Sequence, residues 1–110
     1  MENLPFTLPP DPHFVYMLYS PSHDVYYKGY TKNPKKRLAQ HNAGESTYTK
    51  NRCPWQLVYL QVFSTQSEAL KRERVLKRQN RPFLESLLTH KINVLDTVTC
   101  LNSFQKIFRM

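Results

Sequence analysis

Three short runs of apolar and aromatic residues, separated by turn residues, predict three strands. The first runs from Phe14 to Tyr19 and the second from Val25 to Tyr30. Both runs are rich in aromatic and β-branched residues, which favour strands, and residues 21–24 between them are typical of a turn. The two runs therefore predict a β-hairpin. A third apolar run, from Leu57 to Phe63, predicts a buried strand.

The pairing of the two hairpin strands decides which side chains become neighbours. In one register Tyr16 lies opposite Tyr27. In a second register, whose loop is two residues longer, Tyr16 lies opposite Gly29. Because side chains alternate between the two faces of a sheet, both registers place Tyr16 and Tyr27 on the same face. We expect two neighbouring phenols, either as an ordinary cross-strand aromatic pair or as part of a site.

Capping residues predict a first helix between the second and third strands. Asn33 is a good N-cap, Pro34 suits the first helical position, and Gly44 suits a helix stop. Within this helix Arg37 and His41 are four residues apart and share one stripe of the surface.

A second helix is predicted from the capping box at 65–68 to about Gln79. Glu73 lies on or beside its apolar stripe, because it is three residues from both Leu70 and Leu76. A carboxylate on the apolar side is costly unless it is paired, hydrogen-bonded or bound to a metal. Glu73 is therefore either an edge residue that pairs with a neighbouring cation or a functional carboxylate.

The ends of the chain are less regular. Residues 1–12 contain four prolines and predict an extended, loosely held lead-in. Pro82 suits the start of a third helix over 83–88. The stretch 92–110 has apolar residues without a clean period, so we expect a C-terminal extension there.

Composition and charge indicate a single domain with a polyanionic partner. A chain of 110 residues suits one domain. The 16 Lys and Arg residues outnumber the 8 acidic ones, and the excess is concentrated between Lys28 and Arg81, which hold 13 basic and 3 acidic residues. Such a basic region is either a nucleic-acid-binding surface or a solubilising one.

Several classes of protein lack support in the sequence. The longest apolar run has six residues, too few to cross a membrane, and the first residues do not resemble a signal peptide, so we expect a cytoplasmic protein without a membrane partner. Cys53 and Cys100 are expected to be free thiols. No P-loop, H-E-x-x-H or G-x-S-x-G motif is present. His13, His23 and His90 are expected at the surface.

The remaining candidates suit the cleavage of phosphodiester bonds; they are Tyr16, Tyr27, Arg37, His41 and Glu73. An arginine holds a phosphate with two parallel hydrogen bonds and stabilises added negative charge. One carboxylate suffices for a Mg²⁺ ion that keeps most of its water. A tyrosine becomes a useful base only where nearby cations lower its pKa.

Several blocks of sequence, in the same order and spacing, resemble the GIY-YIG nuclease superfamily. The resemblance extends from Val15 to about Leu88, and it is greatest to small stand-alone members related to the catalytic domain of the UvrC repair nuclease. The blocks are Val15-Tyr16-Met17-Leu18, Tyr26-Tyr27-Lys28-Gly29-Tyr30-Thr31, Arg37-Leu38 with His41-Asn42-Ala43-Gly44, Tyr48-Thr49-Lys50, Trp55-Gln56-Leu57-Val58-Tyr59 and Glu68-Ala69-Leu70-Lys71-Arg72-Glu73.

The resemblance implies a fold, an activity and a cofactor. The fold is a small α/β (α+β) domain over 13–91, with a three-stranded antiparallel sheet flanked by helices. The activity is hydrolysis of nucleic acid to give a 3′-hydroxyl and a 5′-phosphate. DNA is favoured over RNA, and the sequence leaves open whether the substrate is single-stranded, duplex, branched or damaged DNA, or RNA. By analogy Glu73 holds one Mg²⁺ or Mn²⁺ ion.

The resemblance also implies catalytic roles. One of Tyr16 and Tyr27 acts as general base on a water, and the other positions the water or the phosphate. Arg37 stabilises the scissile phosphate, and His41 orients groups or assists proton transfer. Gly29 is the motif glycine, where a close approach of the backbone excludes a side chain.

Three features depart from the pattern of the family. Phe14-Val15-Tyr16 stands in place of G-I-Y. Lys28 replaces an apolar or small residue, and by alternation it points away from Tyr27 and adds to the basic surface. The late asparagine of many members has two candidates, Asn80 and Asn93, and the sequence does not decide between them. We expect phosphate contacts from a set of basic residues: Lys28, Lys35, Lys36, Lys71, Arg74 and Arg78.

Two other functions fit the same sequence. The chain could be a non-catalytic nucleic-acid-binding module on the same fold, for which metal would be irrelevant. It could also be a subunit that supplies a nuclease domain to a larger assembly, an idea suggested by the proline-rich lead-in and the stretch 92–110. Its protein partners are not indicated by the sequence.

Overall fold

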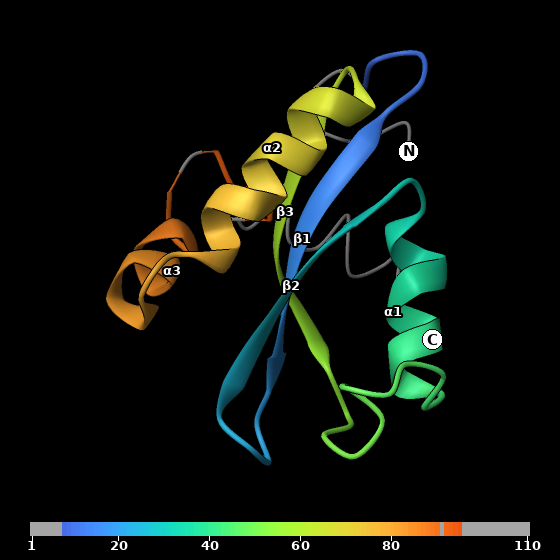
Figure 1. Cartoon of the computed structure of the whole chain (residues 1–110), viewed down its shortest axis with the longest axis vertical. Coiled ribbons are helices and arrows are strands. Elements are labelled where there is room, and N and C mark those ends of the chain that lie inside the picture. Colours follow the sequence, from blue (N-terminus) through green and yellow to red (C-terminus); the bar gives the residue numbers. More distant parts are fainter. Residues whose placement is uncertain (1–7, 91, 96–110) are drawn as a thin grey trace.

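The structure is a computed structural model, and it describes residues 8–90 and 92–95. A three-stranded antiparallel sheet carries helices on both faces (Figure 1). This architecture confirms the expected α/β class. The elements in chain order are β1 (His13–Ser20), β2 (Val25–Thr31), α1 (Pro34–Asn42), β3 (Gln56–Phe63), α2 (Gln66–Lys77) and α3 (Arg81–Leu87). The strand order is β2-β1-β3, so that β1 is central and β2 forms one edge.

The hairpin adopts the register with the longer loop. Tyr16 pairs with Gly29, and Leu18 pairs with Tyr27. The loop is closed by a hydrogen bond from the Asp24 amide to the Ser20 carbonyl at 2.7 Å. Asp24 itself has a positive φ of 53°, a conformation that aspartate adopts more readily than most residues.

The two faces of the sheet carry separate apolar clusters. On one face the even-numbered residues of β1, such as Tyr16, pack with Leu38 of α1 and with Trp55. On the other face the odd-numbered residues, such as Met17, pack with Leu76 of α2 and with α3. Because β1 is buried on both faces, its sequence is a continuous apolar run rather than an alternating one.

Helices α1 and α2 begin at the residues that the sequence predicts, whereas α3 begins at Arg81, one residue before the predicted start at Pro82. Asn33 accepts a hydrogen bond from the Lys36 amide at 3.1 Å, and Thr65 accepts one from the Glu68 amide at 3.2 Å. These side chains satisfy backbone donors that have no partner inside the helix. Asn80 caps α3 in the same way, which gives it a structural role.

Residues 92–95 pack against β3 as part of the core. The buried Asn93 side chain accepts from the Leu60 amide at 3.0 Å and donates to the carbonyls of Val58 and Leu88 at 3.0 and 3.1 Å. The Val94 amide also donates to the Leu60 carbonyl at 2.9 Å. Asn93 therefore holds the segment after α3 on the sheet. The rest of the predicted extension, 96–110, and most of the predicted lead-in, 1–7, lie outside the described residues.

One prediction about the surface is wrong. His13 is only 7% exposed, because its ring stacks on Tyr30 and its Nδ1 makes a 2.7 Å hydrogen bond to the Tyr30 hydroxyl. Cys53 has a free thiol that donates to the His41 carbonyl at 3.2 Å, and Cys100 lies outside the described residues. Within the part of the chain that the structure describes, no helix is both long and apolar enough to cross a membrane.

Candidate active site

The centre of the site is the hydroxyl of Tyr16, which reaches across the edge strand at Gly29. The ring of Tyr16 projects from β1 and passes directly over the Gly29 backbone. A Cβ atom placed on Gly29 would lie 2.4 Å from the Tyr16 hydroxyl, far inside contact distance. Glycine is therefore required there for the approach of the ring, as the resemblance implied.

A buried chain of hydrogen bonds starts at this hydroxyl. Tyr16 Oη lies 2.9 Å from His41 Nε2, and His41 Nδ1 lies 2.8 Å from Thr49 Oγ1. All three side chains are buried. Arg37 adds a cation, because its Nε donates to Tyr16 Oη at 3.4 Å. The i, i+4 spacing on α1 thus brings Arg37 and His41 to the same phenol.

Burial keeps the side chains of Tyr16 and His41 uncharged at neutral pH. Burial raises the pKa of Tyr16 to about 12, although the hydrogen bond from Arg37 opposes the rise. Burial and the charge of Arg37 lower the pKa of His41 to about 4. Tyr16 is therefore a phenol and His41 a neutral imidazole. Where Nδ1 of His41 carries the hydrogen and donates to Thr49, its Nε2 is free to accept the Tyr16 proton.

The second phenol of the hairpin lies beside the first. The ring centroid of Tyr27 is 6.3 Å from that of Tyr16 and 4.9 Å from that of His41. The prediction that both phenols share one face of the sheet is confirmed. Trp55 closes this cluster, with a centroid 6.3 Å from that of Tyr27, and it is buried as expected of a core residue.

Glu73 approaches the site from α2, on the opposite face of the sheet. Its side chain is 17% exposed, and it lies 3.5 Å from Lys77 Nζ. Burial is the main cause of the raised pKa of Tyr16, and the charge of Glu73 adds a small contribution in the same direction. The low exposure of the Glu73 side chain agrees with its predicted position on or beside the apolar stripe of the helix. The ion pair with Lys77 agrees with the prediction that Glu73 is an edge residue paired with a neighbouring cation.

The side chains of the described residues can be examined for ligands of the expected divalent metal. Among the described residues no group of three or more His, Cys, Asp or Glu side chains could hold an ion. A cage of protein ligands is therefore absent from this part of the chain. A single carboxylate beside a phosphate site nevertheless suits Mg²⁺, which keeps several waters and uses one or two carboxylates with substrate oxygens. Its role as a metal ligand stays a prediction.

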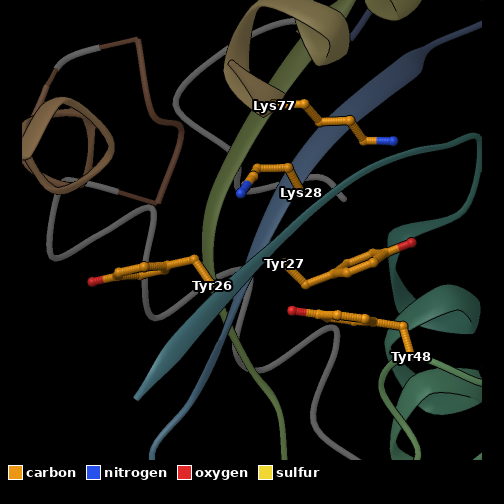
Figure 2. Close-up of a pocket in the computed structure, with 5 residues that line it drawn as sticks. All are labelled: Tyr26, Tyr27, Lys28, Tyr48 and Lys77. Carbon is orange, nitrogen blue, oxygen red and sulfur yellow. The ribbon is translucent and has the colours of Figure 1, made fainter. Parts of the chain in front are cut away.

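A pocket of about 160 Å³ extends from the site around the outer edge of β2 (Figure 2). The residues that line it are Tyr26, Tyr27, Lys28, Tyr48 and Lys77. Lys28 and Tyr27 lie on opposite faces of the strand, as alternation predicts, since Lys28 pairs with Met17 and Tyr27 with Leu18. The pocket contacts both because it wraps around the edge.

The other predicted phosphate contacts are spread over two sides of the molecule. They are all exposed: Lys35 and Lys36 on α1, Lys71 and Arg74 on α2, and Arg78 at the C-cap of α2. Because α1 and α2 cover opposite faces of the sheet, these residues do not form one patch (Figure 1). Lys28 is the member of the predicted set that lines the pocket, together with Lys77.

The sequence did not predict the contacts that three residues make around the site. Thr49 binds His41, Tyr48 contacts Tyr27 with ring centroids 5.8 Å apart, and Lys77 pairs with Glu73. A signal was present for two of them, because Tyr48-Thr49-Lys50 is one of the blocks that carry the resemblance. The surrounding stretch is polar, and its composition does not indicate that Thr49 is buried.

Comparison with known proteins identifies the family of this chain. A family model described as the GIY-YIG catalytic domain matches residues 12–86. A UPF0213 protein of Staphylococcus saprophyticus is 44% identical over 72 residues, which are 64% of this chain and 87% of that protein. A UPF0213 protein of Natronomonas pharaonis is 40% identical over 77 residues, 69% of this chain and 89% of that protein.

A third relative and a solved structure are also similar to this chain. A UPF0213 protein of Streptococcus pneumoniae is 45% identical over 65 residues, so that the match spans 58% of this chain and 66% of that protein. The solution NMR structure of a UPF0213 protein of Bacillus halodurans is 30% identical, with a TM-score of 0.49, and covers 77% of this chain and 90% of that one.

Proposed function

The chain belongs to the GIY-YIG catalytic-domain family, a nuclease superfamily, and from this we propose that it is a divalent-metal-dependent endonuclease acting on DNA. The products are a 3′-hydroxyl and a 5′-phosphate. The observation that carries the proposal is the buried hydrogen-bond chain from Tyr16 through His41 to Thr49, with Arg37 on the same phenol.

In this proposal the hydrogen-bond chain from Tyr16 through His41 to Thr49 serves as a path for one proton. A water next to Tyr16 gives its proton to the phenol oxygen while the phenol passes its own proton to Nε2 of His41. The resulting hydroxide attacks phosphorus, the bond to the 3′ oxygen breaks, and that oxygen takes up a proton from solvent. Thr49 holds the ring of His41 in the orientation, and with the hydrogen on Nδ1, that this transfer needs.

Arg37 and Tyr27 suit the phosphate. Arg37 has neutral hydrogen-bond partners, Tyr16 and Gln40 at 3.4 and 3.2 Å, so its charge is available to a substrate oxygen. An added phosphoryl charge in the transition state is stabilised most by donors that are already in place. Tyr27, beside the ring of His41, is placed to orient the water or the phosphate.

Glu73 would hold the divalent cation. A cation there would neutralise charge on the phosphate and on the leaving oxygen. Lys77 has to release the carboxylate, and their 3.5 Å separation is longer than that of a strong ion pair.

The test is a cleavage assay on labelled single-stranded, duplex and branched DNA with Mg²⁺, Mn²⁺ or EDTA. Glu73→Gln keeps the size of the side chain and removes its charge. Glu68→Gln on the same helix is the matched control, because glutamine also completes a capping box. We expect cleavage that needs metal, a loss on the order of 10²-fold in Glu73→Gln, and full activity in Glu68→Gln.

Two outcomes would contradict the proposal. Cleavage by Glu73→Gln at the wild-type rate in EDTA would show that another activity is being measured. If the wild type retains DNA at low salt but cuts none of the substrates with either metal, the chain is a binding module on this fold.

A further inference from the structure

The pocket at the outer edge of β2 combines aromatic and cationic walls. Tyr48 is 50% exposed, although its ring is held in place by neighbours. Its centroid lies 5.8 Å from that of Tyr27, and the guanidinium of Arg52 lies 4.5 Å from the ring centroid while it donates to the Tyr48 carbonyl. An exposed aromatic ring fixed in this way is a platform on which a flat group can stack at little cost in side-chain entropy.

The opposite wall of the pocket carries two cations, of which one has an acidic partner. Lys28 and Lys77 both line it, and Glu73 pairs with Lys77. No ion-pair partner of Lys28 occurs within residues 8–90 and 92–95. Burial and the charge of Lys77 lower the pKa of Lys28, so the ammonium group is destabilised in the free protein. An anion bound between the two lysines would relieve this repulsion.

The pocket is continuous with the active site. Tyr27 belongs to both, because it lines the pocket and its ring lies 4.9 Å from that of His41. Figure 2 shows Tyr27 and Tyr48 together on one side of the strand, with Tyr26 and Lys28 on the other side and Lys77 above them. A ligand that follows this edge therefore meets cations and aromatic rings one step away from Tyr16.

We propose that this edge pocket is a subsite for one unpaired nucleotide that flanks the scissile phosphate, so that the preferred substrate is a single strand. The phosphate of this nucleotide lies against Lys28 and Lys77, and its base packs on the rings of Tyr27 and Tyr48. The inference rests on the proposed function and names its substrate class.

The geometry of base stacking favours a single-stranded substrate over a duplex. In a duplex both faces of a base are covered by neighbouring base pairs, so its π-face cannot reach a protein ring. The pocket of about 160 Å³ at the edge of the sheet is large enough to receive one base. Stacking is also tolerant of sequence, so no strong preference for one base is expected.

The first test measures binding without cleavage. Every variant carries Glu73→Gln in addition, and the affinity for a labelled oligonucleotide is measured by fluorescence anisotropy, with single-stranded DNA, the same sequence as RNA, and duplex DNA. We expect Tyr48→Ala to weaken single-strand binding about 5- to 150-fold, the effect of one stacked base. Tyr48→Phe keeps the ring and should stay within about twofold, and duplex binding should not change.

Two further measurements test the phosphate contact and the stacked base separately. Lys28→Gln should reduce the salt slope of single-strand binding by about 0.7, the value for one phosphate contact. An abasic site moved along the oligonucleotide should weaken binding at one position, and at that position Tyr48→Ala should cause no further loss.

The outcomes either support or overturn the subsite. The inference is overturned if Tyr48→Ala leaves single-strand affinity unchanged, or if it weakens single-strand and duplex binding equally. The RNA arm decides which sugar the pocket prefers. Failure of the proposed function looks different, because a protein that binds single strands through Tyr48 but never cuts them keeps the subsite and loses the nuclease.

Discussion

Replacing Gly29 with alanine should lower both stability and the proposed activity, because one methyl group would clash with the phenol of Tyr16. The new Cβ would lie 2.4, 2.5 and 2.8 Å from the Oη, Cζ and Cε1 atoms of Tyr16. Ordinary contacts begin at 3.4 Å, so the end of the ring has to move by about 1 Å. Tyr16 is buried, and such a movement carries its hydroxyl away from His41, to which it is now 2.9 Å.

The magnitude follows from these distances. Overpacking of a buried site costs about 1–3 kcal/mol, and loss of a buried hydrogen bond adds about 1 kcal/mol. Alanine is better than glycine in a strand by about 0.5–1 kcal/mol, which opposes the loss. We therefore expect a net loss of about 2 kcal/mol in the free energy of unfolding. A displacement of 1 Å at the reacting groups should also lower the cleavage rate about 10²-fold.

Urea unfolding at constant m-value measures the first effect, and the cleavage assay measures the second. Gly44→Ala is the matched control, since Gly44 has a φ of 79° and its nearest neighbour, Lys50 Cβ, is 3.7 Å away. It should cost about 1–2 kcal/mol through backbone strain while the activity is retained. A second control is Tyr16→Leu, which lacks the three clashing atoms.

Tyr16→Leu provides the refuting comparison. In that background Gly29→Ala should be neutral or stabilising, because the clash is gone. A Gly29→Ala protein as stable as the wild type would contradict the predicted clash. A cost in stability that persists in the Tyr16→Leu background would also contradict it, since the strain would then come from the strand itself and not from the phenol.

Two further predictions concern stability. The pKa of His41 falls from 6.5 to about 4 on folding, so the folded state disfavours a proton that the unfolded chain binds. The free energy of unfolding therefore keeps its full value above pH 6.5 and falls by up to about 3 kcal/mol as the pH is lowered toward 4. Urea unfolding at several pH values should show that the free energy of unfolding depends less steeply on pH in His41→Gln than in the wild type. Asn93→Leu leaves the buried Leu60 amide without its side-chain acceptor and should cost about 1–3 kcal/mol, measured as a lower urea midpoint at unchanged m-value; an unchanged midpoint would contradict the role of Asn93 as a clamp.

Periodicity and capping were enough to predict most of the fold. Alternation placed Tyr16 and Tyr27 on one face in either register, because a shift of two residues does not change the face. The choice between registers depends on the loop, where Asp24 adopts a positive φ that composition alone does not require. Local patterns could not show that Asn93 returns to β3, because that contact joins residues 33 positions apart.

The candidate site was predicted less completely than the fold. Side chains on regular elements, such as Arg37 and His41, could be placed by their spacing alone. Thr49 and Tyr48 lie in a polar stretch whose path is determined by distant contacts, for example the hydrogen bond from the Trp55 indole to the Thr49 carbonyl at 2.9 Å. His13 was misplaced for the same reason, since its partner Tyr30 is 17 residues away.

The charges of the site give a reason why its ligand is a polyanion. Burial keeps the Tyr16–His41 pair neutral in the free protein, so that the pair itself takes up none of the positive charge around it. The cations around it are then left for a substrate: Arg37 contacts neutral groups, and the described ion pairs leave Lys28 without an acid. A phosphate entering the site is attracted by these cations and also excludes water, which strengthens each interaction with the phenol oxygen. The same arrangement predicts that binding weakens steeply as salt rises.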